Sequence, residues 1–311
     1  MTRCSEQMAR TRRRSGPAAF RYRCCNMLEP DRTAQFDDLA ALYDRLVDWP
    51  RRLSREAPFF RRWFELHAVR RVVDLACGTG HHAAMFHSWG LEVTGVDVSA
   101  GMLARCRARH GEGPRLRWVQ ASFDQPLALN DPADAVVCLG NSLALAEDDS
   151  VLRRAVRVMT MALRPGGIGV VQVLNLQALP IGPVHWQKVR RIDQDDRSAV
   201  LLKGVHRVND RGYVSVIELT MRPDGGVDHR AHSAGFLEVS RAALESAIVE
   251  SGGTVCRVLG GYDEVAFDAH QSTDLLVVWQ GPAGGGCDAR SVRLDRTLPS
   301  AILKGDLSVK R

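Results

Sequence analysis

The sequence predicts a doubly wound α/β fold in which a seven-stranded, mostly parallel sheet carries an antiparallel β insertion after its fifth strand. Three observations predict it. Short apolar segments alternate with amphipathic segments between residues 71 and 173, a glycine-rich turn follows the first apolar segment, and residues 200–239 hold three strand-like runs without a helix between them. Strands that alternate with helices pair in parallel through right-handed crossovers, whereas strands joined by tight turns pair antiparallel.

The alternating segments give the order of the elements. Amphipathic helices are expected over residues 36–44 and 54–66, and the second has an apolar face made of Phe59, Phe60, Trp63 and Phe64. Strands then follow at 71–76, 91–96, 116–120, 135–139 and 168–173, with helices at 82–88, 100–110 and 149–163. Arg164-Pro165-Gly166-Gly167 is expected to interrupt the chain before the fifth strand.

The pattern changes after the fifth strand. Strands are expected at 200–208, 213–221 and 227–239, joined by turns at Asn209-Asp210-Arg211-Gly212 and Pro223-Asp224-Gly225-Gly226. We interpret residues 176–237 as an antiparallel insertion over the carboxyl edge of the main sheet. A helix over 240–251, with Ser240 as its N-cap, and strands at 254–260 and 273–280 complete the sheet.

The positive charge of the chain lies at its ends. The chain as a whole carries +6, but residues 1–32 hold a net +5 and residues 281–311 a net +3, which leaves −2 for the residues between. A nucleic-acid-binding domain concentrates basic residues on its folded body, so nucleic acid is disfavoured as a partner. We expect one domain over residues 34–280, a disordered basic extension over 1–33 and a flexible tail over 281–311.

Cysteine and histidine spacing indicates neither disulfides nor a metal site. None of the eight cysteines forms a CxxC pair, as is typical of reduced thiols in the cytoplasm. His81, His82 and His87 have no matching cluster of carboxylates or cysteines, so no metal is expected. No uncharged apolar run approaches the roughly 18 residues that cross a bilayer. We therefore expect a cytoplasmic protein that does not bind membranes, and we leave homo-oligomerisation open.

The glycine-rich turn carries the first chemical signal. Gly78 and Gly80 let the backbone turn tightly and approach a ligand at the start of the next helix. Asp97, at the end of the second strand, can accept hydrogen bonds from both ribose hydroxyls of a nucleoside. These features also fit a dinucleotide site, because Gly78-x-Gly80-x-x-Ala83 matches its looser fingerprint. Asp74 distinguishes the two, since a carboxylate repels a pyrophosphate but attracts a ligand with an ammonium and a sulfonium.

Two segments resemble motif I and its successor in class I S-adenosylmethionine-dependent methyltransferases. They are Asp74-Leu75-Ala76-Cys77-Gly78-Thr79-Gly80 and Val93-Thr94-Gly95-Val96-Asp97-Val98-Ser99-Ala100-Gly101-Met102-Leu103. The resemblance implies a Rossmann-like methyltransferase domain with S-adenosyl-L-methionine as its cofactor.

The resemblance also implies a role for individual residues. Gly78 and Gly80 contact the methionine part of the cofactor, and Asp74 holds its amino group. Asp97 binds the ribose, and Met102 packs on the adenine. The further positions that it places around the cofactor are Ala76, Val98 and Leu139.

One position departs from the pattern of these enzymes. They usually place an acid that reads the adenine amino group after the third strand, where this chain reads Gln120-Ala121-Ser122-Phe123-Asp124. Ser122 stands at the expected position. The contact is therefore open, and we favour Asp124 and Phe123 for it.

A further resemblance is to glycine and sarcosine N-methyltransferases. Cys138-Leu139-Gly140-Asn141-Ser142 matches the C-L-G-N-S that those enzymes read after the fourth strand. Tyr43, Trp49, Arg52 and Glu56 resemble their N-terminal helices, which cover the cofactor. The resemblance implies methyl transfer to a small amine, with Trp49 and Arg52 beside the cofactor.

The substrate side differs from that subgroup. After the fifth strand its members resemble R-N-Y-D, whose Arg binds the substrate carboxylate, whereas this chain reads Leu174-Asn175-Leu176-Gln177. A missing guanidinium removes the bidentate partner of a small carboxylate. His185, Arg190 or Arg191 in the insertion could replace it, although each is more typical of a surface residue.

Methyl transfer needs alignment more than acid–base chemistry, because the sulfonium methyl is already activated. We expect Asn141, with backbone carbonyls around Gly140, to orient an amine, and Asn175 and Tyr43 to shape its pocket. The alternative for Asn141 is that it only caps the turn after the strand.

The sequence thus predicts a methyltransferase that acts on a small molecule, at an amine nitrogen. Transfer to an oxygen or to a nucleic acid is the alternative within the class. An NAD(P)-binding oxidoreductase and a non-catalytic cofactor-binding protein are the alternatives outside it.

Overall fold

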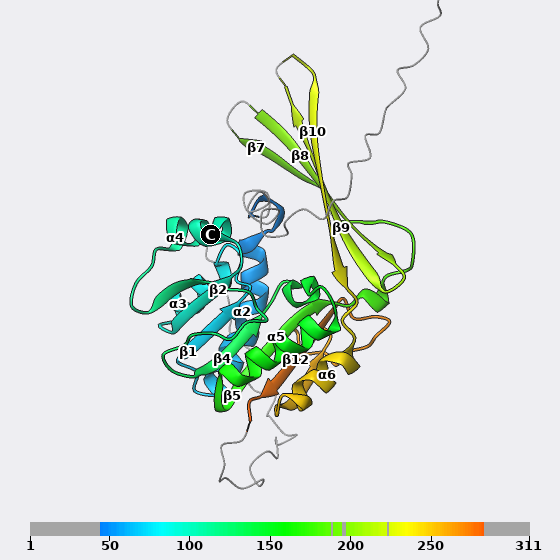
Figure 1. Ribbon diagram of the computed structural model, residues 1–311. Helices are drawn as coiled ribbons and strands as arrows, with labels where there is room; N and C mark the ends of the chain where they lie inside the picture. The colour runs from blue at the N-terminus through cyan, green and yellow to red at the C-terminus, as the bar shows by residue number, and fades with distance from the viewer. Residues whose placement is uncertain (1–43, 188, 195–196, 223, 283–311) are drawn as a thin grey trace, which may run out of the picture.

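The computed structural model describes residues 44–187, 189–194, 197–222 and 224–282, which form an α/β body with a projecting β arm (Figure 1). The main sheet has the order β11-β12-β5-β4-β1-β2-β3. Its strands pair in parallel except for β12, which is antiparallel to both β5 and β11. The predicted seven-stranded, mostly parallel sheet is confirmed.

The body consists of α2 (Trp49–Leu66), β1 (Arg71–Leu75), α3 (His81–Ser88), β2 (Glu92–Asp97), α4 (Ala100–His110), β3 (Leu116–Gln120), β4 (Ala133–Cys138), η1 (Ser142–Leu145), α5 (Asp149–Ala162), β5 (Leu163–Leu174), η2 (Leu176–Ala178), α6 (Arg241–Glu250), β11 (Thr254–Leu259) and β12 (Asp274–Gln280).

Side-chain caps determine where the helices begin. Ser99 Oγ accepts a hydrogen bond from Met102 N at the start of α4, and Ser240 Oγ accepts one from Ala243 N at the start of α6, as the sequence predicts. Helix α2 begins at Trp49 rather than at residue 54, because Asp48 caps it. The earlier start adds a turn that carries Trp49 and Arg52 to the edge of the sheet.

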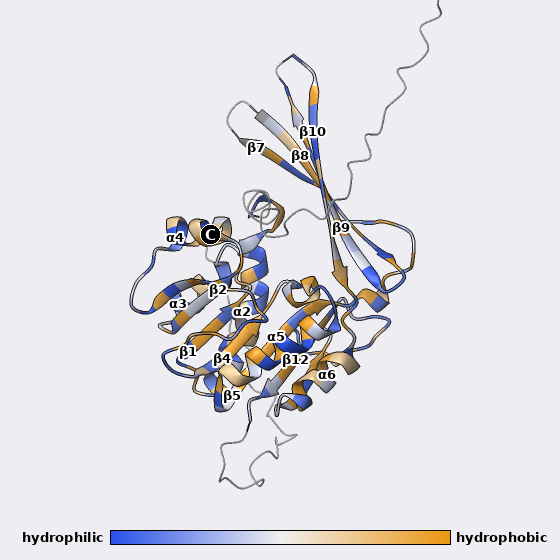
Figure 2. Cartoon of the chain, in the orientation of Figure 1, coloured by the Kyte–Doolittle hydropathy of each residue, from blue (hydrophilic) through white to orange (hydrophobic). Residues whose placement is uncertain are grey.

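The two faces of the main sheet are covered by different helices (Figures 1 and 2). Apolar residues of α2, α3 and α4, such as Phe60, Phe86 and Leu103, pack on one face. Those of α5 and α6, such as Val156 and Ile248, pack on the other. In Figure 2 the central strands are mostly hydrophobic, as strands that are buried on both faces must be. Because both faces are covered, the sheet can offer a ligand site only at its edges, and doubly wound folds place it at the carboxyl ends of the parallel strands.

The expected break before the fifth strand is wrong. Strand β5 already begins at Leu163 and runs through Arg164-Pro165-Gly166-Gly167. Its pairing with β4 shifts register between Ala133 and Ala135, and Gly166 has a φ of 72°. The register shift is a local irregularity within the sheet. The positive φ at Gly166 is a backbone conformation that glycine adopts without strain.

The insertion forms a second, five-stranded sheet that projects as an arm (Figure 1). The three predicted strands are present, and two short strands that the sequence did not predict pair with β8. A two-residue strand such as β6 has no periodicity from which to predict it. The arm strands are β6 (His185–Trp186), β7 (Arg190–Gln194), β8 (Arg197–Val208), β9 (Arg211–Met221) and β10 (Val227–Leu237).

The predicted helix over residues 36–44 lies almost wholly outside the described residues, as do the predicted extension over 1–33 and nearly all of the tail over 281–311. No helix within the described ranges has the length and apolar character needed to span a membrane.

Candidate functional site

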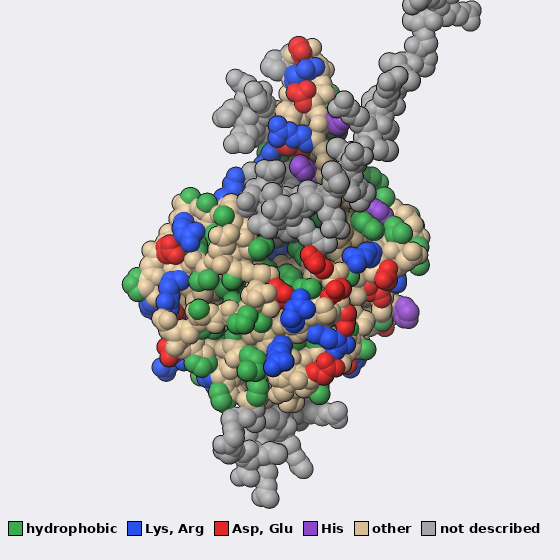
Figure 3. Space-filling model, viewed as in Figure 1, with side chains coloured by type: hydrophobic (Ala, Val, Ile, Leu, Met, Phe, Trp, Pro, Cys, Tyr) green, Lys and Arg blue, Asp and Glu red, His purple; other side chains and the backbone are tan. Residues whose placement is uncertain are grey.

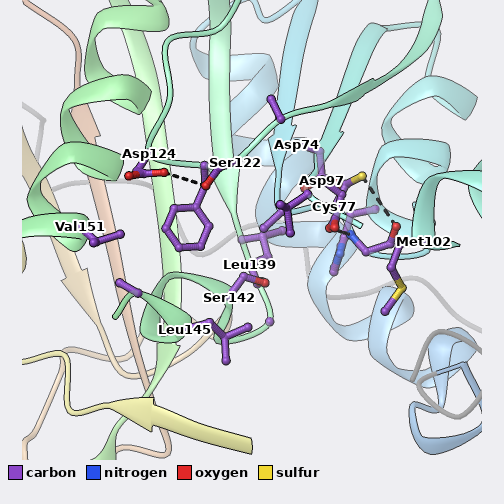
Figure 4. Close-up of a pocket in the computed structure, with 18 of the residues that line it drawn as sticks. Asp74, Cys77, Asp97, Met102, Ser122, Asp124, Leu139, Ser142, Leu145 and Val151 are labelled. Atoms are coloured by element: carbon purple, nitrogen blue, oxygen red, sulfur yellow. Dashed lines mark hydrogen bonds between the residues drawn. The ribbon is translucent and has the colours of Figure 1, made fainter. Parts of the chain in front are cut away.

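A cavity of about 430 Å³ lies at the carboxyl ends of β1, β2 and β4, where the doubly wound fold places its ligand sites (Figure 4). It extends from the glycine-rich turn to the start of α5. Its lining residues are Trp49, Arg52, Asp74, Ala76, Cys77, Gly78, His82, Asp97, Val98, Met102, Ala121, Ser122, Phe123, Asp124, Leu139, Gly140, Ser142, Leu145, Ala146, Glu147, Val151 and Arg154.

Asp97 is oriented by two backbone amides at the wall of this cavity. Its Oδ2 accepts a hydrogen bond from Gly78 N at 2.8 Å, and its Oδ1 accepts one from Ser99 N at 2.9 Å. These bonds connect the glycine-rich turn to the start of α4. They leave the carboxylate facing the cavity in a fixed orientation, as a group that receives ribose hydroxyls requires.

Asp74 is the most unusual group of the site. Its side chain is 2% exposed, and one carboxylate oxygen accepts a hydrogen bond from the backbone of Ala83 in α3. The other, Oδ2, has no hydrogen-bond partner in the described part of the chain. Burial, together with the nearby Asp97 carboxylate, raises the pKa of Asp74 to about 7. A buried carboxylate oxygen without a donor costs free energy unless a ligand supplies the donor, so the site fits a cationic N–H group.

The far end of the cavity suits a flat aromatic base. Met102, Val98 and Phe123 supply apolar walls. Beside them, Ser122 Oγ donates a hydrogen bond to Asp124 Oδ1 at 2.7 Å, as Figure 4 shows. Burial acts to raise the pKa of Asp124, but the Ser122 hydroxyl and the Arg154 guanidinium outweigh it and lower the pKa.

Helix α2 closes the cavity with a buried polar network. Arg52 Nε donates to Glu56 Oε1 at 2.9 Å, and His82 Nε2 lies 2.7 Å from Glu56 Oε2. Burial acts to raise the pKa of Glu56, but His82 and Arg52 lower it overall, so Glu56 stays ionised. Burial lowers the pKa of His82. The network therefore holds Arg52 at the cavity wall as a cation.

The segment before α2 is attached to the glycine-rich turn. Asp44 Oδ1 accepts a hydrogen bond from Thr79 Oγ1 at 2.6 Å, and its Oδ2 lies 2.7 Å from Arg109 Nη1. Burial acts to raise the pKa of Asp44, but its bonds with His81 and Thr79 and the charge of Arg109 lower it to about 2. Trp49 stacks on His81 at 4.2 Å between ring centroids, which completes the attachment.

Most of the predicted cofactor residues line this one cavity. Gly80 does not: its φ is 77°, and a Cβ there would meet Trp118 at 2.7 Å and Cys106 at 2.8 Å. Gly80 is needed because the side chains of Trp118 in β3 and Cys106 in α4 pack directly against its backbone. The predicted residues that do line the cavity are Asp74, Ala76, Gly78, Asp97, Val98, Met102, Phe123, Asp124, Leu139, Trp49 and Arg52.

Two of the three expected catalytic residues are described, and both make hydrogen bonds within the fold. Asn141 follows the cavity residue Gly140, but its Oδ1 accepts a hydrogen bond from Leu174 N at 2.8 Å and joins β4 to β5. Asn175 is 4% exposed, and its Nδ2 donates to Ala269 O and Ser272 O. Neither asparagine lines the cavity. Tyr43 lies outside the described residues.

The sequence reasoning also missed residues that line the cavity. His82 lines the cavity from the first turn of α3, directly after the glycine-rich turn, and that position in the sequence could have marked it. Glu147 precedes α5 and Arg154 lies within its first half, a region that no motif marks. Of the insertion residues considered for an anion, Arg190 instead lies 3.6 Å from Asp48. No group of three potential metal ligands occurs in the part of the chain that the structure describes.

The surface around the site is of mixed charge. Figure 3 shows basic and acidic side chains interspersed over the visible face of the body. Over the described residues of that face, phosphates of a nucleic acid would meet both signs of charge.

Comparison with known proteins agrees with this geometry. Residues 72–167 match the family model of a methyltransferase domain. A glycine/sarcosine N-methyltransferase of Parasynechococcus marenigrum is 33% identical over 145 residues, which cover 46% of this chain and 51% of that protein. A glycine N-methyltransferase of Oryctolagus cuniculus is 29% identical over 213 residues, or 58% of this chain and 70% of that protein. The chain spans about half the length of the glycine/sarcosine N-methyltransferases that it matches.

Solved structures share the fold. The CcbJ methyltransferase from Streptomyces caelestis has a TM-score of 0.65 at 24% identity, covering 82% of this chain and 100% of that chain. The sugar N-methyltransferase KedS8 from Streptoalloteichus sp ATCC 53650 has a TM-score of 0.62 at 25% identity, covering 74% of this chain and 88% of that chain.

Proposed function

We propose that this chain, a member of the class I S-adenosylmethionine-dependent methyltransferases, transfers the methyl group of its cofactor to an amine nitrogen of a small molecule. One observation carries the proposal: the unpartnered, buried carboxylate oxygen of Asp74 lies in the same cavity as the ribose-type carboxylate Asp97.

The charge of Asp74 separates this proposal from an oxidoreductase. A dinucleotide would bring a pyrophosphate to the glycine-rich turn, where two carboxylates repel it. S-adenosylmethionine brings an ammonium and a sulfonium, which those carboxylates attract. The fold alone does not separate the two, because both classes bind ligands at this edge of the sheet.

In the proposed complex each end of the cavity holds a different part of the cofactor. Asp74 accepts hydrogen bonds from the ammonium, and Asp97 accepts them from the ribose hydroxyls. Met102 and Phe123 pack on the base, with Ser122 and Asp124 at its edge. Trp49 and Arg52 of α2 cover the methionine end and exclude water.

The bound cofactor supplies a methyl group on a sulfonium, which needs no further activation. The chain contributes orientation, by holding the acceptor nitrogen in line with the methyl carbon near Gly140, where alignment is worth on the order of 7–11 kcal/mol. The nitrogen preference is supported by relatives that are described as glycine, sarcosine and sugar N-methyltransferases.

Two measurements test the proposal. Titration calorimetry with S-adenosylmethionine, S-adenosylhomocysteine and NAD(P)H identifies the cofactor. A screen of glycine, sarcosine and amino sugars for S-adenosylhomocysteine release identifies the acceptor, with the matching hydroxy compounds as controls. Heat with the sulfur compounds and turnover of an amine are expected. Binding of NAD(P)H alone, or turnover of hydroxy compounds alone, contradicts the proposal.

A further inference from the structure

A histidine in the cavity wall has one ring nitrogen without a partner. His82, in the first turn of α3, is 5% exposed and lines the cavity. Its Nε2 lies 2.7 Å from Glu56 Oε2, whereas its Nδ1 makes no hydrogen bond with the residues that the structure describes. The rings of Phe60 and Phe86 pack beside it, with centroids 6.5 Å and 6.3 Å away. A partner for Nδ1 can therefore enter only through the cavity.

The Glu56 carboxylate determines which nitrogen of His82 carries the proton. Burial acts to raise the pKa of Glu56, but His82 and Arg52 lower it overall, so Glu56 is ionised. An ionised carboxylate can only accept, so Nε2 of His82 must donate to it. Burial lowers the pKa of His82 and outweighs the effect of Glu56, so the ring is neutral. With its proton on Nε2, the neutral ring has a lone pair on Nδ1, which can only accept a hydrogen bond.

A second acceptor borders the same end of the cavity. Ala83, which follows His82 in the chain, donates its backbone N–H to one carboxylate oxygen of Asp74. The other oxygen, Asp74 Oδ2, is buried and has no hydrogen-bond partner in the described part of the chain. Asp74 and His82 both line the cavity. The first turn of α3 thus brings two acceptors to the cavity wall, and neither has a donor among the described residues.

Two acceptors in one place select the chemistry of the ligand group that meets them. Each buried acceptor costs free energy until a donor reaches it, so the group needs at least two N–H or O–H bonds. A carboxylate or a phosphate supplies no donor and is repelled by Asp74. A hydroxyl supplies only one donor. A primary ammonium has three N–H donors and a positive charge, so it can bond to both acceptors at once.

We propose that His82 Nδ1 and Asp74 Oδ2 together bind a primary ammonium group, the α-ammonium of S-adenosylmethionine, and that Glu56 positions His82 for this contact. The inference rests on the proposed function and adds His82 and Glu56 to the cofactor site. His82 touches the ligand, whereas Glu56 acts through His82 by fixing the proton on Nε2. The site thereby selects its cofactor by the free amino group as well as by the ribose and the base.

Two ligands that differ in one group isolate this contact. S-adenosylhomocysteine carries the primary ammonium, and 5′-S-(3-carboxypropyl)-5′-thioadenosine is the same molecule with hydrogen in place of that group. Both keep the carboxylate, the ribose and the adenine. Damage to the cavity wall weakens both ligands, whereas loss of an ammonium contact weakens only the first. Calorimetry with the whole chain measures both dissociation constants.

The variant His82→Phe removes Nδ1 and keeps a flat ring in its place. The dissociation constant of S-adenosylhomocysteine is expected to rise about 10- to 100-fold, because a hydrogen bond from a charged group is lost. The dissociation constant of the deaminated analogue is expected to stay unchanged. His87→Phe, the same substitution on the same helix at a residue that does not line the cavity, is the matched control. It is expected to bind both ligands as the wild type does.

The variant Glu56→Gln tests the position of the proton. Arg52 Nε can only donate to the side chain at position 56, so the new amide oxygen faces Arg52 and the amino group faces His82 Nε2. The imidazole proton then moves to Nδ1, which opposes the ammonium instead of accepting from it. The dissociation constant of S-adenosylhomocysteine is expected to rise about 10-fold or more, with that of the deaminated analogue unchanged. Because this variant keeps the side-chain volume, it decides the question if His82→Phe fails to fold.

The possible failures are distinguishable. If the wild type binds S-adenosylhomocysteine but both variants bind it as tightly, or if both ligands weaken equally, the ammonium contact is wrong and the proposed function stands. If the wild type binds neither S-adenosylmethionine nor S-adenosylhomocysteine, the proposed function fails and the ammonium contact with it.

Discussion

In the proposed complex, a single residue, Asp74, determines which cofactor this doubly wound domain takes. Its carboxylate stands near the carboxyl end of β1, with one oxygen bonded to the α3 backbone and the other buried without a hydrogen-bond partner in the described part of the chain. A dehydrogenase and a methyltransferase can share the glycine-rich turn and the acid after β2. The sign of charge beneath the turn separates them.

Asp74→Asn is expected to weaken S-adenosylmethionine binding by about 10- to 100-fold, because the variant loses a charge-assisted hydrogen bond. The wild-type affinity should itself fall as pH drops below about 7, where Asp74 takes up a proton. The variant should lack this dependence. Calorimetry across pH 5.5–8.5 measures both the affinity and its pH dependence. Asp131→Asn, at an exposed acid that does not line the cavity, is the control. Equal affinities of the wild type and Asp74→Asn at pH 8 would contradict the assigned role.

The same residue makes a prediction about stability without ligand. The pKa of Asp74 is about 7 in the folded state, against an ordinary value of 3.8 for an aspartate in water, so the folded state binds the proton more tightly. That contribution is fully present below about pH 4 and is lost as pH rises through 7. Urea titrations of the wild type should show stability falling over this window, and Asp74→Asn should flatten the change. A wild-type profile that does not decline towards pH 7 argues against a buried, neutral carboxyl.

At the scale of the elements, tryptophans are packed onto glycines in the sheet. Trp118 of β3 lies over Gly95 of β2, and Trp279 of β12 lies over Gly169 of β5. A Cβ would come within 2.5 Å of Trp118 at Gly95 and within 2.2 Å of Trp279 at Gly169. Each glycine therefore makes space for a large ring that covers the sheet. The glycine in Val93-Thr94-Gly95-Val96-Asp97 serves packing between neighbouring strands rather than the ligand.

Gly95→Ala is expected to reduce the free energy of unfolding by about 1–3 kcal/mol, since the added methyl displaces a packed indole. Gly113→Ala is the matched control, because a Cβ there meets nothing within 4 Å. Chemical denaturation of both variants provides the comparison. Similar midpoints for the two would mean that Trp118 can move aside freely.

At the scale of the whole molecule, the segment that attaches α2 to the glycine-rich turn also contacts the arm. The segment before α2 packs between the body and the arm, where Leu46 contacts Leu201 and Val216. Arg45 Nη1 lies 2.5 Å from Glu218 Oε1 on β9. Covering the cavity thus depends on the contacts between the arm, α2 and the glycine-rich turn.

Asp44→Asn is expected to speed cofactor release by about 5- to 10-fold, because it weakens the bonds to Thr79 and Arg109 that hold Trp49 and Arg52 over the cavity. Stopped-flow displacement of S-adenosylhomocysteine measures the release rate. Glu245→Gln on α6, whose partner is Arg241 on the same helix, is the control. An unchanged rate would show that the segment does not limit release.

By itself the sequence determined the elements of the main sheet and the cofactor end of the site. These features depend on contacts within one element or between two consecutive elements. Ser99 caps the helix that begins next to it, and Asp97 accepts a hydrogen bond from the turn after the adjacent strand. Such groups meet whenever the local pattern folds, so periodicity and motif spacing suffice to place them.

Only the tertiary structure decided which polar groups remain available for chemistry. The side-chain amide of Asn175 donates hydrogen bonds to the carbonyls of residues 269 and 272. Asp274 accepts a hydrogen bond from Gln172 because β12 pairs with β5. These partners lie about a hundred positions apart in the chain. Whether a buried polar side chain is satisfied or left for a ligand depends on neighbours that the strand order brings together, and no local pattern encodes that order.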